Sequence, residues 1–275
     1  MPASAILCYH ETGYSPPASA KIARSVARDW DTPTASMQTE AGSAMTVNST
    51  SPAADQSALT TYERYLNIPE LLTLQKPPAE RLHPDELVFQ ITHQTFELWW
   101  KLTVELLERA TALLEQDRFD QAAIAVNRAT AAQEVTCAAM RQLELMPPAD
   151  FLVIRKGLSD GNGGDSPGFR GILRRAPDLW DAFAGAIERA GVNLVELYAE
   201  PHARPAVYAC AEALTEFDER FNLFRAAHLK LAQRHLGLQS RGTGGTPMAA
   251  LERTLLDLLF PDLWRARDAL VAQQS

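Results

Sequence analysis

Two histidines, His93 and His228, are the residues of this chain whose type and position could do chemistry. Each falls on an apolar face of a segment with helical periodicity, and His93 shares its face with Phe89, Phe96 and Trp100. Neither belongs to an HxxxH or HExxH pair, which argues against a zinc or di-iron site. An apolar helical pocket with one axial histidine is what haem requires, and a second histidine could then bind or deprotonate a substrate. The alternative is that both are core histidines bonded to carbonyl groups.

The two histidines would be carried by two long buried helices of an all-α bundle. The first is expected over about residues 84–115, because this segment is apolar nearly all round when read at 3.6 residues per turn. The second is expected over about residues 205–236 and ends at Gly237, as expected for a helix C-cap. The glycine-rich residues 157–171 predict a loop long enough to carry function. Shorter helices are expected over about residues 61–72, 120–143, 149–155, 177–189, 247–260 and 262–272.

Composition and charge exclude several classes of protein. The chain has 275 residues, of which 46% are hydrophobic and 22% charged, as in ordinary globular proteins. Its net charge of -8 argues against a nucleic-acid partner. No apolar run approaches the roughly 20 residues of a membrane span. Cys8, Cys137 and Cys210 are far apart and include no CxxC pair, which indicates a reducing cytoplasm.

The domain organisation follows from a change in composition near residue 57. Residues 1–57 are rich in Ala, Ser, Thr and Pro without an apolar period, and predict a mostly disordered leader. Residues 58–275 carry the helical periodicity and predict a single all-helical domain.

Several motifs occur in one order along the chain. Phe89-x-x-x-His93-Gln94-x-x-Glu97-Leu98-Trp99-x-Lys101 resembles the signature helix of the tryptophan 2,3-dioxygenase superfamily, which are histidine-ligated haem oxygenases. The resemblance covers about residues 59–270 and implies an all-helical bundle around a b-type haem. Its other marks are Tyr62-x-x-Tyr65-Leu66, Leu143-Glu-x-Met146, Phe151-Leu-x-x-Arg155, His228-x-x-x-x-x-Arg234-x-x-Gly237, Gly242-Thr243-Gly244-Gly245 and Phe260-Pro-Asp-Leu.

The resemblance implies a metal-binding role for one residue and a catalytic role for two. His228 would be the proximal ligand of the haem iron. His93 would accept a hydrogen bond from the indole N–H of the substrate. Arg155 would hold the amino-acid carboxylate, which suits a guanidinium fork.

The remaining site residues would shape the pocket. The resemblance implies that Phe89 packs on the indole ring, that Thr243 binds the amino-acid head group, and that Phe151 and Gly163 line the pocket. It also implies that Tyr62-x-x-Tyr65-Leu66 closes the site of a neighbouring subunit, in a homotetramer built as a dimer of dimers.

The sequence departs from the family at the site itself. The family's Ser-Gly-Phe-Gln-Ser is replaced by Asn162-Gly163-Gly164-Asp165-Ser166, and Phe224 stands where the family has tryptophan. Thr246-Pro247-Met248 follows the glycine-rich motif in place of Ser-Ser-Gly. A change of substrate or of reaction outcome would produce such a pattern.

The expected function is a haem b-dependent oxygenase acting at indole C2 of L-tryptophan or a related indole amino acid, with O₂ or peroxide as oxidant. The altered loop slightly favours a specialised monooxygenase that gives a hydroxyindole or oxindole in secondary metabolism. The alternatives are a tryptophan 2,3-dioxygenase that forms N-formylkynurenine, a haem-dependent tyrosine hydroxylase, a non-catalytic haem sensor and a helical interaction protein without haem.

Overall fold

The computed structural model describes the chain from Leu59 onward with a few gaps, all within one compact unit, Met37–Ser275. The leader expected over residues 1–57 and the site residue Thr243 lie outside the described residues, so both remain predictions. The described residues are 59–159, 161, 163–239, 241, 242, 245 and 247–274.

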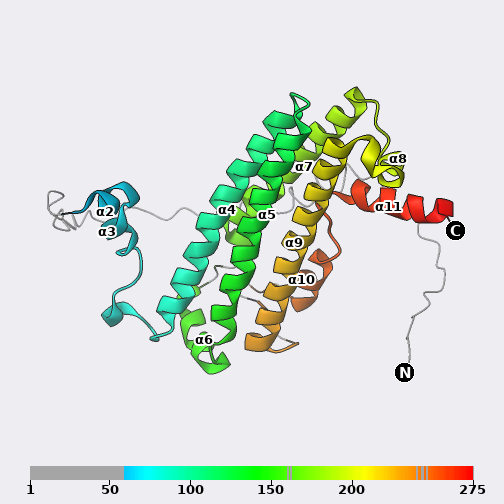
Figure 1. Cartoon of the computed structure of the whole chain (residues 1–275). Coiled ribbons are helices and arrows are strands. Elements are labelled where there is room, and N and C mark those ends of the chain that lie inside the picture. The colour runs from blue at the N-terminus through cyan, green and yellow to red at the C-terminus, as the bar shows by residue number, and fades with distance from the viewer. Residues whose placement is uncertain are drawn as a thin grey trace, which may run out of the picture. The chain divides into compact units, whose positions relative to one another are not determined.

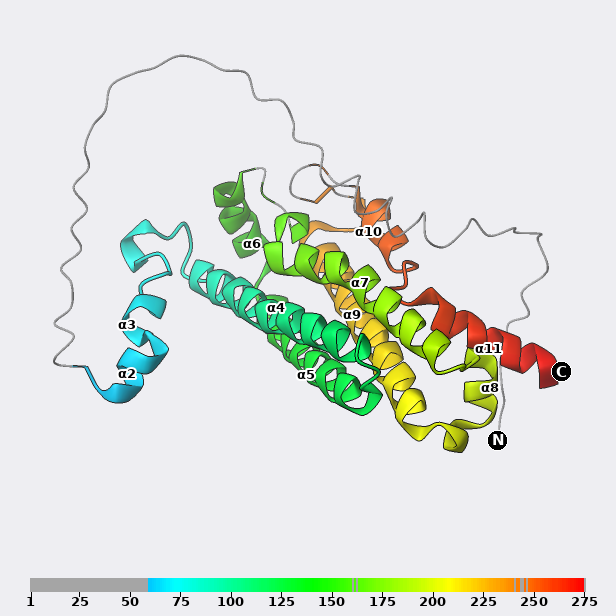
Figure 2. The same ribbon diagram turned by 90° about the horizontal axis from the view of Figure 1, so that it is seen from above.

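Long helices form the bundle, as the periodicity predicts. α5 packs against α4 on one side and α9 on the other, and α7 packs along α4 (Figures 1 and 2). The long helices are α4 (Glu86–Leu114), α5 (Phe119–Glu144), α7 (Pro167–Arg189) and α9 (Pro205–Leu236). The short helices are α2 (Thr61–Leu66), α3 (Ile68–Leu71), α6 (Pro148–Arg155), α8 (Leu194–Ala199), α10 (Met248–Thr254) and α11 (Pro261–Gln274). The 3-10 helices are η2 (Pro78–Glu80), η3 (Lys156–Leu158), η4 (Gly163–Asp165) and η5 (Pro201–Ala203).

The all-α prediction is confirmed for the part of the chain that the structure describes. An isolated bridge between Arg241 and Pro247 is the β-structure found there. No helix among the described residues is both long and apolar enough to cross a membrane. Large buried side chains of α4 and α9 meet in the core, including Phe96, Trp100, Leu107, Phe217, Phe221 and Phe224.

The loop expected over residues 157–171 is shorter than predicted, because α7 begins at Pro167. Gly168 and Gly171 lie inside this helix, where α7 approaches α4 closely. A Cβ on Gly168 would lie 2.7 Å from Cβ of Trp100, and a Cβ on Gly171 would lie 2.8 Å from Cγ2 of Val104. These glycines therefore serve close helix packing and not a turn.

Pro177 lies within α7, although we expected it to begin a separate helix. A proline in a helix interior costs about 3 kcal/mol, because one hydrogen bond is lost and the ring clashes with the preceding turn. The fully buried Ile172, Leu179 and Phe183 on the same helix offset this cost.

The expected helix over 247–260 ends early, at Thr254. The cause lies on α9, where the fully buried carboxylate of Asp218 accepts the backbone N–H groups of Leu259 at 2.9 Å and Phe260 at 3.2 Å. It also accepts the indole N–H of Trp264 at 3.0 Å. These bonds hold residues 259 and 260 in the turn that starts α11.

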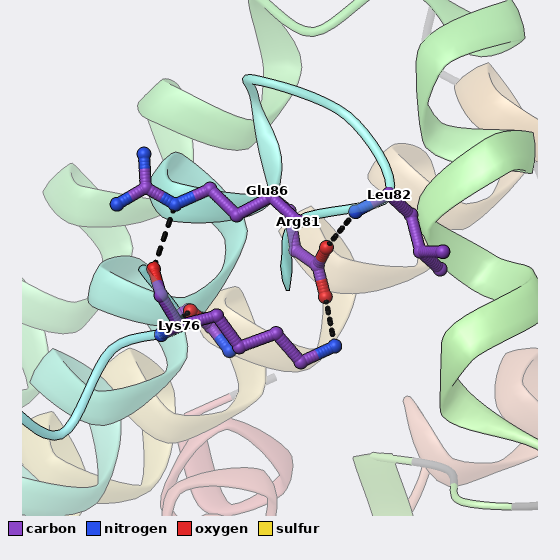
Figure 3. A network of polar contacts seen from close by, with 5 residues as sticks. Lys76, Arg81, Leu82 and Glu86 are labelled. Atoms are coloured by element: carbon purple, nitrogen blue, oxygen red, sulfur yellow. Dashed lines mark hydrogen bonds and ion pairs between the residues drawn. The ribbon is translucent and has the colours of Figure 1, made fainter. Parts of the chain in front are cut away.

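A polar network fixes the chain at the start of α4 (Figure 3). The buried carboxylate of Glu86 accepts hydrogen bonds from Nζ of Lys76 and the backbone N–H of Leu82, both at 2.7 Å. Burial raises the pKa of Glu86, but these bonds outweigh it and hold the pKa below its ordinary value. Arg81 Nε donates to the carbonyl of Lys76 at 2.8 Å. Residues 76–86 are thus bound to the base of α4, next to α6.

Candidate functional site

His93 sits on α4 with its protonation fixed by a backbone group. Its Nδ1 lies 2.7 Å from the carbonyl oxygen of Phe89, one turn earlier. Because a carbonyl can only accept, Nδ1 carries the proton and Nε2 keeps a free lone pair. Burial lowers the pKa of His93 and outweighs the Phe89 bond and the charge of Glu97, which raise it. His93 is therefore a neutral imidazole that can accept a hydrogen bond at Nε2.

Aromatic rings connect His93 with His228 on α9. The His93 ring contacts Phe96 edge-on at 5.6 Å between centroids, and Phe96 meets Phe224 at 5.5 Å. The Trp100 and Phe224 ring centroids lie 5.2 Å apart. Phe224 stacks on His228 with 6.4 Å between ring centroids and 10° between ring planes. The packing of α4 and α9 in one core thus brings the two histidines of the sequence prediction into one site.

His228 is a neutral imidazole in apolar surroundings. Desolvation, with the neighbouring His93 as the smaller cause, lowers the pKa of His228 to about 4. None of the described residues forms a hydrogen bond with its ring. A Cβ at position 163 would lie 3.6 Å from Nε2 of His228, so Gly163 borders this nitrogen.

This environment fits a haem ligand. Haem needs an axial imidazole that is neutral, not committed to another partner and enclosed by apolar side chains. His228 is neutral, has no hydrogen-bond partner for its ring among the described residues and stacks on Phe224, and a Cβ at position 163 would lie in ordinary van der Waals contact with its Nε2.

Phe151 on α6 closes the side of the site next to Phe89. The centroids of these two rings lie 6.4 Å apart. Phe151 stacks on His235 with 4.6 Å between ring centroids and 16° between ring planes. His235 is buried and its Nε2 lies 3.2 Å from the carbonyl oxygen of Met146, so this histidine fixes the junction before α6. Phe89 and Phe151 therefore form an aromatic wall next to His93.

Arg155 ends α6 and reaches the glycine-rich segment. Its Nη2 donates to the carbonyl oxygen of Arg241 at 3.0 Å, across 86 positions of sequence. Thr243, which we expected to act with Arg155, lies outside the described residues. The contact nonetheless brings Arg155 to the segment that contains the expected partner.

Three expected residues lie away from this cluster in a single chain. Tyr62 is 68% exposed, Tyr65 85% and Leu66 41%, and their helix α2 has no buried residue. One chain therefore does not pack these side chains into a pocket.

A second cluster, formed by His83, Asp85 and Asp150, has metal-binding residue types. Nδ1 of His83 accepts the backbone N–H of Asp85 at 3.2 Å, so Nε2 carries the proton and faces Asp150 at 3.6 Å. Metal binding at Nε2 would move this proton to Nδ1 and break the hydrogen bond that Nδ1 accepts from Asp85. The cluster is better explained as a polar contact between the base of α4 and α6.

Sequence reasoning assigned no role to Glu97 or His235. Both are polar residues on largely apolar helix faces, which is the signal that each needs a partner in the fold. His235 finds the Met146 carbonyl, and Glu97 binds the start of α7 through Ser166 and Gly168.

Comparison with known proteins agrees with the motifs. The model of a family described as tryptophan 2,3-dioxygenase matches residues 46–175. A tryptophan 2,3-dioxygenase of Arthrobacter sp. (strain FB24) is 27% identical over 78% of this chain and 93% of its own length. The proteins of the same name from Herpetosiphon aurantiacus and Caulobacter vibrioides are each 29% identical. They cover 75% and 76% of this chain, and 97% and 98% of their own lengths.

Proposed function

The chain is a divergent member of the tryptophan 2,3-dioxygenase superfamily, and from this premise we propose that it oxidises L-tryptophan to N-formylkynurenine. The similarity supports a haem-dependent oxidoreductase that acts on tryptophan and uses haem b. The observation that carries the proposal is the neutral His93, protonated on Nδ1, in one aromatic cluster with His228, whose ring forms no hydrogen bond with the described residues.

The number of oxygen atoms inserted decides between two readings. The altered loop slightly favours a monooxygenase, but the relatives that match along nearly their whole length are named tryptophan 2,3-dioxygenase, which favours the dioxygenase. The altered segment 162–166 remains the one feature that favours a monooxygenase, which we keep as the second candidate.

Each residue of the cluster has a distinct part in this proposal. His228 would hold the haem, which when bound supplies the iron at which O₂ reacts. His93 would accept the indole N–H at Nε2 and so set the ring's orientation. Arg155 would bind the carboxylate by charge-assisted hydrogen bonds. Phe89 and Phe151 would pack against the indole and exclude water, and Thr243 would bind the head group.

The assembly belongs to the proposal as well. Tyr62, Tyr65 and Leu66 would close the site of a neighbouring subunit in a homotetramer, which their exposure in one chain supports. A cytoplasmic location, with no nucleic-acid or membrane partner, is also proposed. Related indole amino acids are also proposed as substrates, because Gly164 stands where the family pattern has phenylalanine.

The haem-ligand role is tested by His228→Ala, with His235→Gln as the matched control on the same helix. His228→Ala should lose the Soret band after haem supplementation and gel filtration, whereas His235→Gln should retain it. L-Tryptophan should shift the ferric spectrum of the wild type, which distinguishes an enzyme from a haem sensor that does not bind tryptophan. A His228→Ala variant with an unchanged Soret band would contradict the assignment.

A further inference from the structure

Glu97 lies on α4 one helical turn beyond His93, and its carboxylate reaches across to α7. One oxygen accepts the backbone N–H of Gly168 at 2.9 Å, and the other accepts the hydroxyl of Ser166. The Ser166 hydroxyl in turn accepts the backbone N–H of Phe169 at 3.0 Å. A single carboxylate next to His93 therefore holds the first turn of α7.

The start of α7 is built to receive this carboxylate. Pro167 has no N–H to satisfy, and the N–H groups of Gly168 and Phe169 are bound by Glu97 and Ser166. A Cβ on Gly168 would lie 2.8 Å from Oε2 of Glu97, so a side chain there would push the carboxylate away. The negative charge also faces the positive end of the helix dipole.

The segment before α7 runs from this anchor to His228. Arg170 holds it from α7, with Nε donating to the carbonyl of Gly164 at 2.6 Å and Nη2 to Asp165 at 2.7 Å. At the far end, Gly163 lies beside Nε2 of His228. Residues 163–166 thus run between Glu97 and the ring that would bind haem, and they coincide with the stretch that departs most from the family pattern.

We propose that Glu97 is a positioning residue of the site. Its carboxylate fixes Ser166 and the start of α7, and through them sets where residues 163–165 lie relative to His93 and His228. Glu97 itself touches neither substrate nor haem in this scheme. The effect of residues 163–165 on haem and substrate rests on the proposed function. The anchoring of these residues by Glu97 does not.

The test compares Glu97→Ala, Glu97→Gln and Ser166→Ala with Glu108→Ala in the full-length protein. Glu108 is the matched control, because its carboxylate also joins α4 to α7, through Nε of Arg175 at 2.7 Å, but about three turns farther along α4. Hydrogen–deuterium exchange of residues 163–170 is measured with and without added haem. The KM and kcat for L-tryptophan are measured on the haem-loaded protein.

Loss of hydrogen bonds to a charged group should speed exchange at Gly168 and Phe169 about tenfold in Glu97→Ala and leave it unchanged in Glu108→Ala. The KM should rise about tenfold in Glu97→Ala, with kcat within about threefold of the wild type. Glu97→Gln should recover part of both effects, because its amide oxygen can still accept the Gly168 N–H. Ser166→Ala should show the faster exchange at Phe169 without removing any charge.

Equal exchange in Glu97→Ala and Glu108→Ala would overturn the proposal. Faster exchange with an unchanged KM would also overturn it, because Glu97 would then only stabilise the end of α7. A wild-type protein that binds no haem would instead contradict the proposed function. Hydrogen–deuterium exchange in the haem-free protein would then still show whether Glu97 anchors residues 163–170.

Discussion

At the scale of single residues, the chemistry depends on where protons lie. The carbonyl of Phe89 fixes the proton of His93 on Nδ1, and burial keeps the ring neutral. Nε2 is left as an acceptor on a ring that packs against Phe89 and Phe96, which suits a substrate with one N–H on a flat apolar ring. His228 is neutral for a similar reason, since desolvation opposes its protonation.

His93→Ala should therefore retain haem and lose turnover. Removal of the acceptor for the indole N–H should lower kcat/KM for L-tryptophan by about a hundredfold, the lower range for a positioned acid–base group. The Soret band should stay at wild-type intensity, because His228 is untouched. Steady-state kinetics and the absorption spectrum check both points, and unchanged kinetics would remove His93 from the mechanism.

At the scale of helices, sequence periodicity predicted the long elements well. The expected helices over 84–115 and 205–236 correspond to α4 and α9, because continuous apolar faces without internal breakers leave few alternatives. The predicted start of α7, at Pro177, was wrong. Gly168 and Gly171 are residues typical of loops, so the sequence alone predicted a loop where this helix begins. Their use in close packing depends on Trp100 and Val104 of another helix, which local sequence does not reveal.

The same distinction holds for the site. The motif around His93 could be predicted from spacing along one helix. The contact between Arg155 and Arg241 joins residues that are 86 positions apart, and Glu97 binds residues about 70 positions away, so neither could be predicted from local spacing. The proton position on His93 follows only from the contact of its Nδ1 with the Phe89 carbonyl in the folded chain.

Gly168→Ala should destabilise the protein through the α4–α7 contact. Its Cβ would meet Cβ of Trp100 at 2.7 Å, and overpacking of this kind costs about 1–3 kcal/mol. Gly185→Ala is the control in the same helix, where the nearest atom is the flexible end of Arg189 at 3.2 Å. It should be neutral or stabilising by up to about 1 kcal/mol. Urea unfolding of both variants checks the difference, and equal stabilities would show that α7 is not tightly packed at Gly168.

At the scale of the whole molecule, the exposed α2 supports the proposal that a second copy completes the site. Tyr65 is 85% exposed, and α2 contains no buried residue in one chain. Large apolar side chains exposed together on one helix indicate an interaction surface. The polar network around Glu86 ties residues 76–86, which follow α2 and α3, to the base of α4.

We predict that the protein is a tetramer with a mass four times the 30.3 kDa of one chain. We also predict that the double variant Tyr62→Ala/Tyr65→Ala has a higher KM for L-tryptophan than the wild type. Leu256→Ala, which alters a residue that is 83% exposed elsewhere, should leave the KM unchanged. Light scattering checks the mass. Mixing the double variant with His228→Ala during refolding should restore part of the activity, because each subunit then supplies what the other lacks. A fully active monomer would contradict the shared site.

We propose that this chain opens the indole ring of L-tryptophan by inserting both atoms of O₂. The most direct test is the mass of the product formed by reduced, haem-loaded protein from L-tryptophan under ¹⁸O₂. We expect N-formylkynurenine with two labelled oxygen atoms. A hydroxyindole or oxindole with one labelled atom would contradict it, and would assign the altered segment 162–166 to a monooxygenase.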